Sequence, residues 1–272
     1  MSYRKNFDSR VNDNGEETFS NLDFFMLKDL SIIDMKIRRT MMIFCLDIEH
    51  FFKVYLLNKV YEHFGDGYTI VKEYFDFLKQ ENQGKQYDNF ISELNNRENS
   101  VYSQELAIKY KGDYPIWVII ELTSFGKFVK LFKFIADKID DSEMNKYAYL
   151  LKNVRELRNA CAHNNCIIND FRRKDSYKYL DKGLKNFLYK NGFKKTTIST
   201  KMSNPRVQQI CTLLYLNHIT SLSESMSKYN KSELRRLKRR VLENIDIYSK
   251  NNLVYSNLMF LTDFIDIMIN MN

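Results

Sequence analysis

The chain has 272 residues, of which 44% are hydrophobic and 28% charged, as is typical of a soluble globular protein. It contains only 8 Gly and 2 Pro, which excludes a turn-rich β-sandwich, a collagen-like chain and a Pro/Gly linker protein. The net charge of +8 permits nucleic acid or an acidic membrane as a partner but requires neither. So few helix breakers predict an all-α fold, a helical bundle.

The hydrophobic pattern predicts helices along the chain after a polar, flexible segment at residues 1–19. Residues 32–64 are expected to form one long helix or a kinked pair of helices, which ends at the turn Gly65-Asp66-Gly67. Short helices joined by loops are expected within residues 86–111, and a polar loop within residues 193–204. The other expected helices cover residues 68–79, 116–123, 127–137, 143–161, 177–189, 205–226, 232–247 and 253–269, with a turn at 82–84 and Ser142 as a capping residue. Of these, the short apolar run 116–123 is also compatible with a buried strand.

The last of these helices is apolar, but Asp263 and Asp266 interrupt it at helical spacing. We therefore expect an amphipathic core helix and not a membrane span. The chain does not open with a signal peptide, so we expect a cytoplasmic protein with no membrane partner. Its 4 Cys form no CxxC pair, and with only 4 His the pattern does not favour a zinc site.

Arg158 is unusual within the expected helix 143–161. On a helical wheel it falls in the same arc as the apolar residues Tyr147, Leu150, Leu151, Val154, Leu157 and Cys161. Burying an unpaired guanidinium is costly, so Arg158 either pairs with a carboxylate in a buried or interface salt bridge or faces a site that receives an anion. Residue type alone favours the salt bridge.

The residues around Arg158 favour the anion site. Arg158 is followed directly by Asn159, and His163 comes five residues after Arg158. This R-N-x-x-x-H pattern resembles the signature of HEPN-domain ribonucleases, and it lies late in an amphipathic helix, where HEPN motifs also occur.

A second stretch resembles a more specific family. Residues 114–126, which contain the only Trp of the chain, resemble the P-x-W-x-x-x-E-x-x-S-F-G segment of the Abi-like, abortive-infection family. Upstream, Ile37-Arg38-Arg39 and the stretch 46–50 resemble a helix of that family. The resemblance covers roughly residues 32–170. It departs from the family after the motif His, where Asn164-Asn165-Cys166 replaces the usual His-Asn-Arg.

The resemblance implies an all-helical, HEPN-type bundle, and together with the composition it predicts three parts. These are a flexible N-terminus at residues 1–19, an N-terminal helical region at 20–112, and a HEPN-like core with basic C-terminal helices at 113–272. It also implies a metal-independent endoribonuclease of bacterial anti-phage defence that needs no cofactor. The relatives of this family often act as toxins held in check by an antitoxin, and in some the antitoxin resembles a structured non-coding RNA.

The chemistry of RNA cleavage suits these residue types. Cleavage by the ribose 2′-OH needs a proton acceptor, a proton donor for the leaving oxygen, and positive charge near the phosphorus. An imidazole such as that of His163 can exchange a proton, and the Arg158 guanidinium can bind two phosphate oxygens. Asn159 can orient either one. On a continuous helix Arg158 and His163 lie roughly 140° apart, so they converge on one phosphate only if the helix breaks, which Asn164-Asn165 allows, or if a second copy contributes. The resemblance to HEPN enzymes implies two domains paired about a two-fold axis, and we therefore expect a homodimer with a composite site.

Supporting roles are assigned to Glu121 and Arg155. Glu121 can pair with Arg158 or Arg155, and this structural role is favoured over a catalytic one. Arg155 is interpreted as a phosphate contact or a solvated side chain. Two basic stretches, residues 171–195 and 231–240, carry the positive charge and predict RNA binding, although a solvated lysine-rich helix face explains them as well. The candidate RNA contacts are Arg172, Arg173, Lys174, Lys178, Lys182, Lys185, Arg235, Arg236, Arg239 and Arg240.

Two other interpretations remain open. The chain can be a HEPN-fold RNA-binding protein that does not cleave, as a component of a ribonucleoprotein. It can also be a structural helical adaptor in which Arg158 forms a salt bridge. The adaptor predicts loss of folding in Arg158→Ala, because a partner would remain buried without its charge.

Overall fold

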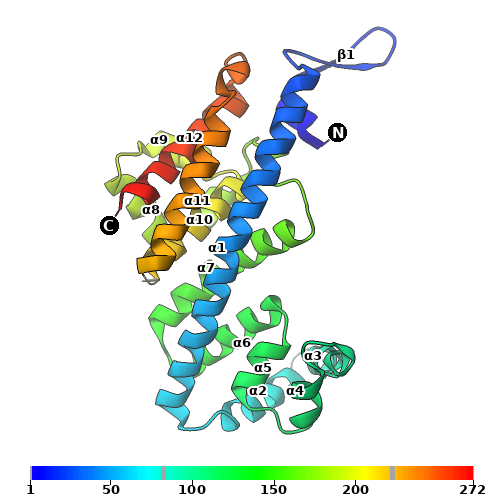
Figure 1. Ribbon diagram of the computed structural model, residues 1–272, viewed down its shortest axis with the longest axis vertical. Coiled ribbons are helices and arrows are strands. Elements are labelled where there is room, and N and C mark those ends of the chain that lie inside the picture. Colours follow the sequence, from blue (N-terminus) through cyan, green and yellow to red (C-terminus); the bar gives the residue numbers. More distant parts are fainter. Residues whose placement is uncertain (1, 81–83, 221–223, 272) are drawn as a thin grey trace. The chain divides into compact units, whose positions relative to one another are not determined.

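The computed structural model describes residues 2–80, 84–220 and 224–271, and most of them are helical (Figure 1). This confirms the all-α class. The sheet in the described residues is a two-stranded antiparallel hairpin of β1 (Ser9–Val11) and β2 (Glu17–Phe19). The α-helices are α1 (Phe24–Phe64), α2 (Thr69–Gln80), α3 (Lys85–Asn96), α4 (Gln104–Lys109), α5 (Ile116–Leu122), α6 (Phe125–Lys138), α7 (Ser142–Ala162), α8 (Lys182–Lys190), α9 (Lys195–Lys201), α10 (Pro205–Ile219), α11 (Glu224–Leu242) and α12 (Asn252–Asn270). Short 3-10 helices are η1 (Ser2–Asn6), η3 (Arg97–Asn99), η4 (Asp175–Tyr179) and η5 (Ile245–Tyr248).

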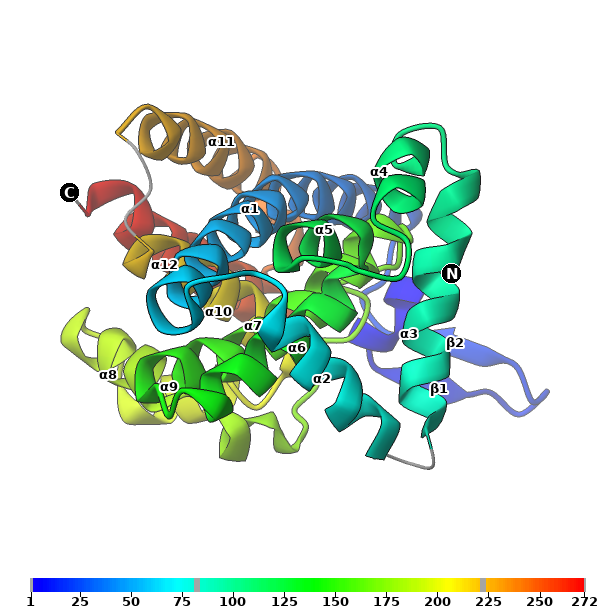
Figure 2. The same ribbon diagram turned by 90° about the horizontal axis from the view of Figure 1, so that it is seen from below.

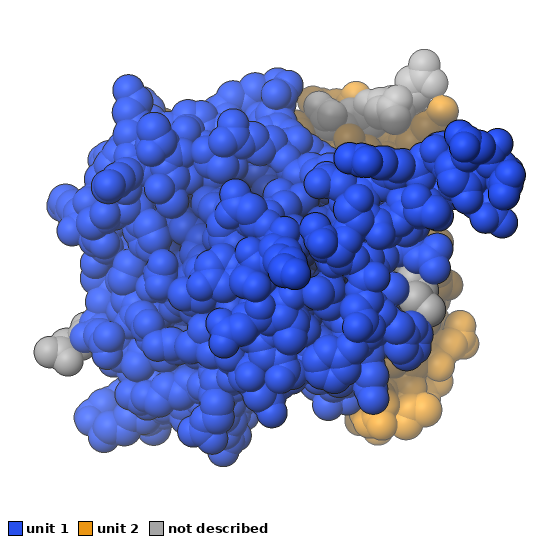
Figure 3. All heavy atoms as spheres, turned by 90° about the horizontal axis from the view of Figure 1, so that it is seen from above, with its two compact units in different colours: residues 1–48, 156–272 blue, residues 49–155 orange. Residues whose placement is uncertain are grey.

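These elements form two compact units, which Figure 3 distinguishes by colour. Unit 1 comprises residues 1–48 and 156–272, and unit 2 comprises residues 49–155. Helices α1 and α7 each continue from one unit into the other along the sequence. The expected boundary between residues 112 and 113 lies within unit 2.

In unit 2 the C-terminal half of α1 packs through aromatic rings. The fully buried ring of Phe52 has its centroid 5.6 Å from that of Phe132 on α6 and 5.1 Å from that of Tyr147 on α7, in edge-on geometry. Helix α1 ends at Gly65, whose φ of +69° lies in the left-handed region that favours glycine. The stop predicted at this position is therefore confirmed, although α1 begins at Phe24, earlier than expected.

In unit 1 helix α12 packs against α10 and α11, and the N-terminal half of α1 contacts α11 (Figures 1 and 2). A buried carboxylate, Asp29 on α1, accepts hydrogen bonds from Arg240 at 2.6 Å, Asn244 at 2.9 Å and the Tyr248 hydroxyl at 2.8 Å. Because a buried charge is tolerated only when it is paired and hydrogen-bonded, these three donors fix α11 and η5 against α1.

The N-terminal segment differs from the expectation of flexibility. In the described residues 2–19, η1 and the β-hairpin are formed, and Asn6 is buried. The Asn6 side chain donates to the carbonyl of Ile168 at 2.9 Å and accepts the N–H of Phe171 at 2.7 Å. The polar composition of the segment does not reveal this contact. The two hydrogen bonds come from one side-chain amide, and they join it to a part of the chain far away in sequence.

Other expectations for loops and caps are corrected. Residues 193–204 are not a loop, since α9 lies within them. Helix α7 is capped by Asp141 and not by Ser142, because the Asp141 carboxylate accepts the N–H groups of Glu143 and Met144, each at 2.9 Å. These bonds and the nearby Lys59 ammonium lower the pKa of Asp141 despite its partial burial.

The expected helix over residues 177–189 is divided into η4 and α8, because Asp181 caps α8 by accepting the N–H of Leu184 at 2.8 Å. The expected helix over residues 205–226 ends at Ile219 as α10, and residues 221–223 lie outside the described residues. Residues 82 and 83 of the expected turn also lie outside them, and the described Gly84 has a φ of +79°.

Helix α12 is long and apolar enough, by length and composition, to cross a membrane. However, 56% of its apolar window is buried within the protein, as in the core helix of a globular protein. Leu258, Phe264 and Ile265 are among its buried side chains, and Asp266 forms an ion pair with Lys238 of α11 at 2.6 Å. The contacts fit the expected core helix.

Candidate functional site

The R-N-x-x-x-H residues lie at the C-terminal end of α7. Arg158 is half-buried, whereas Asn159 and His163 are exposed. The His163 N–H donates to the Asn159 carbonyl at 3.0 Å, so His163 keeps a helical position although α7 ends at Ala162. Residues four apart share a helix face, so Asn159 and His163 lie together. Arg158 lies roughly 140° around the axis from His163.

The helix stops directly after His163 in a Schellman motif. Asn164 has a φ of 53°, in the left-handed region that Asn tolerates better than most residues. The Asn164 N–H donates to the carbonyl of Cys161 at 3.2 Å, and the Asn165 N–H donates to that of Ala160 at 2.9 Å. The helix thus ends at the position where the sequence allows a break, but this position follows both Arg158 and His163.

The segment that follows the motif is held by α1. The fully buried Asp34 accepts the N–H groups of Ile167 and Ile168, both at 2.8 Å, through the same carboxylate oxygen. Asp34 also forms an ion pair with Arg38, one turn later on α1, and Arg38 donates to the carbonyl of Asn165 at 3.4 Å. One carboxylate and one guanidinium therefore fix the backbone just beyond His163.

The cysteines near the motif have structural roles. Cys161 is buried, and burial raises the pKa of its thiol to about 11, although Arg38 partly opposes this. Because the thiolate is the nucleophilic form, a protonated Cys161 is not suited to covalent catalysis at neutral pH. Burial and a hydrogen bond with the Cys166 thiol raise the pKa of Tyr3, which binds η1 to the segment after the motif.

The two supporting residues belong to unit 2. Glu121 is exposed and lies 3.6 Å from the ammonium of Lys53, which is also 3.6 Å from Glu49. The carboxylate thus pairs with a lysine of α1 that the sequence did not indicate. Arg155 is half-buried, and its stem lies beside Gly126, where a Cβ would be 3.5 Å from the Arg155 Cδ.

Eight of the ten candidate RNA contacts are exposed, and the two half-buried ones are Lys185 and Arg240. Arg172 binds Asp170 through two bonds, of 2.9 and 3.1 Å, and this pairing lowers the pKa of Asp170. Arg240 is engaged with the buried Asp29, as described above. Its guanidinium is therefore part of the structural core, and we leave it out of any RNA-binding surface.

Comparison with known families identifies the chain. A family model described as "Abi-like protein" matches residues 1–169. The chain belongs to the Abi-like family. The match includes the stretch 114–126 and residues 158–163, so the resemblance to the Abi-like family is confirmed. Membership of this family indicates a function in abortive infection. No curated protein and no solved structure matches the chain.

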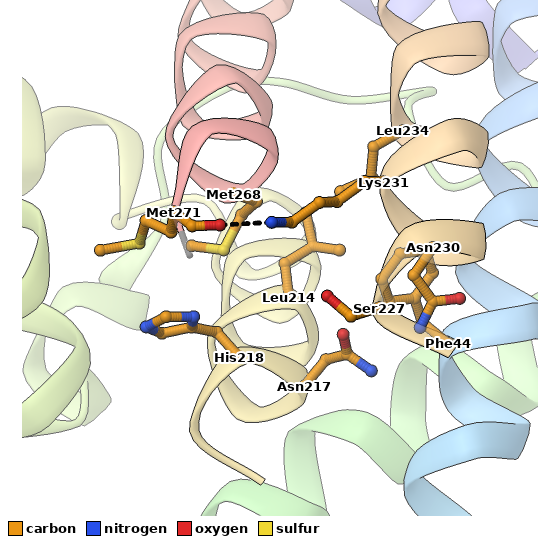
Figure 4. Close-up of a pocket in the computed structure, with 10 residues that line it drawn as sticks. All are labelled: Phe44, Leu214, Asn217, His218, Ser227, Asn230, Lys231, Leu234, Met268 and Met271. Atoms are coloured by element: carbon orange, nitrogen blue, oxygen red, sulfur yellow. Dashed lines mark hydrogen bonds between the residues drawn. The ribbon is translucent and has the colours of Figure 1, made fainter. Parts of the chain in front are cut away.

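Residues beyond position 169, where the family match ends, contribute to a cavity that the sequence did not predict. A space of about 250 Å³ lies in unit 1 between α1, α10, α11 and α12 (Figure 4). Lys231 donates to the carbonyl of Met271 at its rim, and burial together with this ammonium lowers the pKa of the nearby His218. The rest of the lining is both apolar and polar. It consists of Phe44, Leu214, Leu234, Met268, Asn217, Ser227 and Asn230.

Unit 2 contains a larger cleft, of about 610 Å³, lined from α2, α3, α6 and α7. Arg155 is among its lining residues. Within the described parts of the chain, no three His, Cys, Asp or Glu side chains gather as a metal site. In the sequence, the residues that line this cleft belong to an aromatic helix and a later lysine-rich helix. Neither pattern alone indicates a cleft, so the sequence did not predict one.

Proposed function

We propose that this Abi-like protein is a metal-independent endoribonuclease of a bacterial abortive-infection or toxin–antitoxin system. The observation that carries the proposal is the position of the R-N-x-x-x-H residues. Asn159 and His163 are exposed on one face at the end of α7, and the backbone beyond them is pinned by Asp34 and Arg38. An exposed imidazole next to a fixed backbone suits a proton-transfer step on a large substrate.

The reaction is a transesterification within RNA. The ribose 2′-oxygen attacks the adjacent phosphorus as His163 takes the 2′-OH proton. The bond from phosphorus to the 5′-oxygen breaks, and that oxygen receives a proton from an imidazolium. Arg158 stabilises the charge on the phosphorane oxygens, and Asn159 orients its neighbours. The products carry a 2′,3′-cyclic phosphate and a 5′-hydroxyl, and the proposed proton transfers are assigned to side chains, without a metal ion or cofactor.

A homodimer completes this site. Arg158 and His163 of one chain diverge around the helix, whereas a second copy related by a two-fold axis can supply the missing group. The exposed basic residues of the segment 171–195 and of α11 bind the RNA substrate, and a structured regulatory RNA of the antitoxin type is the further partner.

The test compares wild-type protein with His163→Ala and with His50→Ala, a control that removes an exposed histidine outside the motif. Each is purified at low salt, co-purifying RNA is sequenced, and cleavage of total RNA is measured in EDTA. We expect cleavage by wild type and His50→Ala, with 2′,3′-cyclic phosphate ends, and a loss of about 10²–10⁴-fold in His163→Ala.

Equal cleavage by wild type and His163→Ala contradicts the proposal. If no variant cleaves and one defined RNA binds equally to all three, the protein is the non-cleaving RNA-binding component considered above. The bound RNA is then removed under denaturing conditions, the protein is refolded, and the cleavage assay is repeated. Cleavage that appears only after this step indicates inhibition by an RNA antitoxin, whereas continued inactivity indicates the non-cleaving RNA-binding protein.

A further inference from the structure

Three aromatic side chains line the cleft of unit 2. Tyr74 and Phe77 of α2 lie against Phe134 of α6, with ring centroids 5.1 and 5.0 Å from that of Phe134. Tyr74 is buried, but Phe77 is 41% exposed, so part of this aromatic surface is open to solvent. A large exposed Phe beside a cleft marks a surface suited to a flat apolar ligand.

The rim of the same cleft is positively charged. Its lining contains five basic side chains, Lys130, Lys133, Lys138, Lys152 and Arg155, against the single acid Asp137. Lys133 pairs with Asp137, and Lys138 lies 3.2 Å from Glu73. Lys130 is 3.2 Å from the neutral amide of Gln86, and Lys152 is exposed. The cleft therefore keeps an excess of positive charge after its ion pairs are formed.

We propose that this cleft is a nucleotide-binding site, in which a nucleobase stacks on Phe77 and Phe134 and a phosphate lies against Lys130 and Lys152. Aromatic rings combined with lysines match the two parts of a nucleotide, a π-face and an anion. The volume of about 610 Å³ falls in the range of small-molecule sites, roughly 300–1,000 Å³, and is ample for one nucleotide. The site goes beyond the proposed cleavage, since none of its residues belongs to the R-N-x-x-x-H motif.

The ligand has two sources, a free nucleotide or a nucleotide of single-stranded RNA. The experiment therefore titrates full-length His163→Ala protein, which prevents cleavage, with AMP, UMP and a five-nucleotide RNA by calorimetry at two salt concentrations. Phe77→Ala and Lys152→Glu are introduced into this protein. Tyr102→Ala and Lys146→Glu are the matched controls, because both original side chains are exposed in unit 2 outside the cleft.

We expect Phe77→Ala to weaken binding by about 5- to 150-fold, the usual range for loss of one base–aromatic contact. Lys152→Glu weakens binding most at low salt, and both controls bind as the parent protein does. Binding of AMP or UMP identifies a free nucleotide as the ligand. If only the five-nucleotide RNA binds, the ligand is a nucleotide within single-stranded RNA.

The absence of binding by all three probes overturns the proposal, and so does binding that is equal in Phe77→Ala, Lys152→Glu and their controls. Since Lys152 is exposed, Lys152→Glu stays informative if Phe77→Ala fails to fold. The assay measures equilibrium binding, so its outcome is independent of whether the wild-type protein cleaves RNA.

Discussion

Replacing Asp34 by Ala tests whether α1 holds the backbone beyond His163 in place. The substitution removes the acceptor of two N–H groups, those of Ile167 and Ile168, and the partner of Arg38. Asp34 is fully buried, and the Arg38 side chain is only 14% exposed, so water replaces neither interaction well. The loss therefore falls on the segment that positions the end of α7.

Breaking a buried ion pair by removing one partner costs about 3–5 kcal/mol. Each buried N–H left without an acceptor costs about 1–3 kcal/mol. Part of this cost is already contained in the value for the broken ion pair, so the two are not added. We therefore expect Asp34→Ala to lower the free energy of unfolding by about 3–5 kcal/mol, a large part of the 5–15 kcal/mol typical of a folded protein. The free energy of unfolding of Asp34→Asn, which keeps an amide oxygen as acceptor, should lie between those of Asp34→Ala and wild type.

The assay is urea unfolding followed by far-UV circular dichroism. Asp13→Ala, which removes an exposed acid, is the control and changes stability by less than about 0.5 kcal/mol. The double variant Asp34→Ala/Arg38→Met is less destabilised than the sum of its single changes, because no charge remains unpaired. A cost below about 1 kcal/mol for Asp34→Ala, or simple additivity in the double variant, refutes the reasoning.

Two further predictions concern groups away from the motif. Burial lowers the pKa of Lys201 to about 8, below its value in the unfolded chain, so the unfolded state binds the extra proton between about pH 8 and 10. The contribution of Lys201 to stability should therefore rise with pH in that window, and the difference in urea midpoint between wild type and Lys201→Met should shift in favour of wild type as the pH increases; a constant difference contradicts this. Arg240→Ala should destabilise the fold by about 3–5 kcal/mol because Asp29 stays buried, whereas Arg239→Ala should leave unfolding unchanged and weaken RNA binding in filter assays.

The helices were predictable because their signals are local. The turn at Gly65 and the hydrophobic period of α12 are each contained within a few residues. The R-N-x-x-x-H motif was found for the same reason. Its placement at the end of a helix followed from the periodicity, and Asn164 adopts the left-handed conformation that the expected break requires.

The contacts around the motif were not predictable, because they join distant parts of the chain. Asp34 binds backbone groups more than 130 positions later, and Asn6 binds Ile168 and Phe171. Neither side chain differs in sequence from an ordinary surface Asp or Asn. For the same reason Arg240 was counted among RNA contacts: a run of basic residues does not reveal which one faces a buried carboxylate.

The position of the helix break bears directly on the composition of the site. The left-handed turn at Asn164 comes after His163, so it does not rotate His163 toward Arg158. Of the two ways to bring these groups together, a break and a second copy, the second is favoured.

Complementation between inactive variants tests this. Arg158→Ala and His163→Ala protein are mixed and allowed to exchange subunits. If Arg158 of one copy acts with His163 of the other, half of the dimers are mixed, and each regains one of its two sites. The mixture should then show about a quarter of wild-type cleavage. If both groups act within one chain, neither copy in a mixed dimer has a complete set, and the mixture remains as inactive as each variant alone.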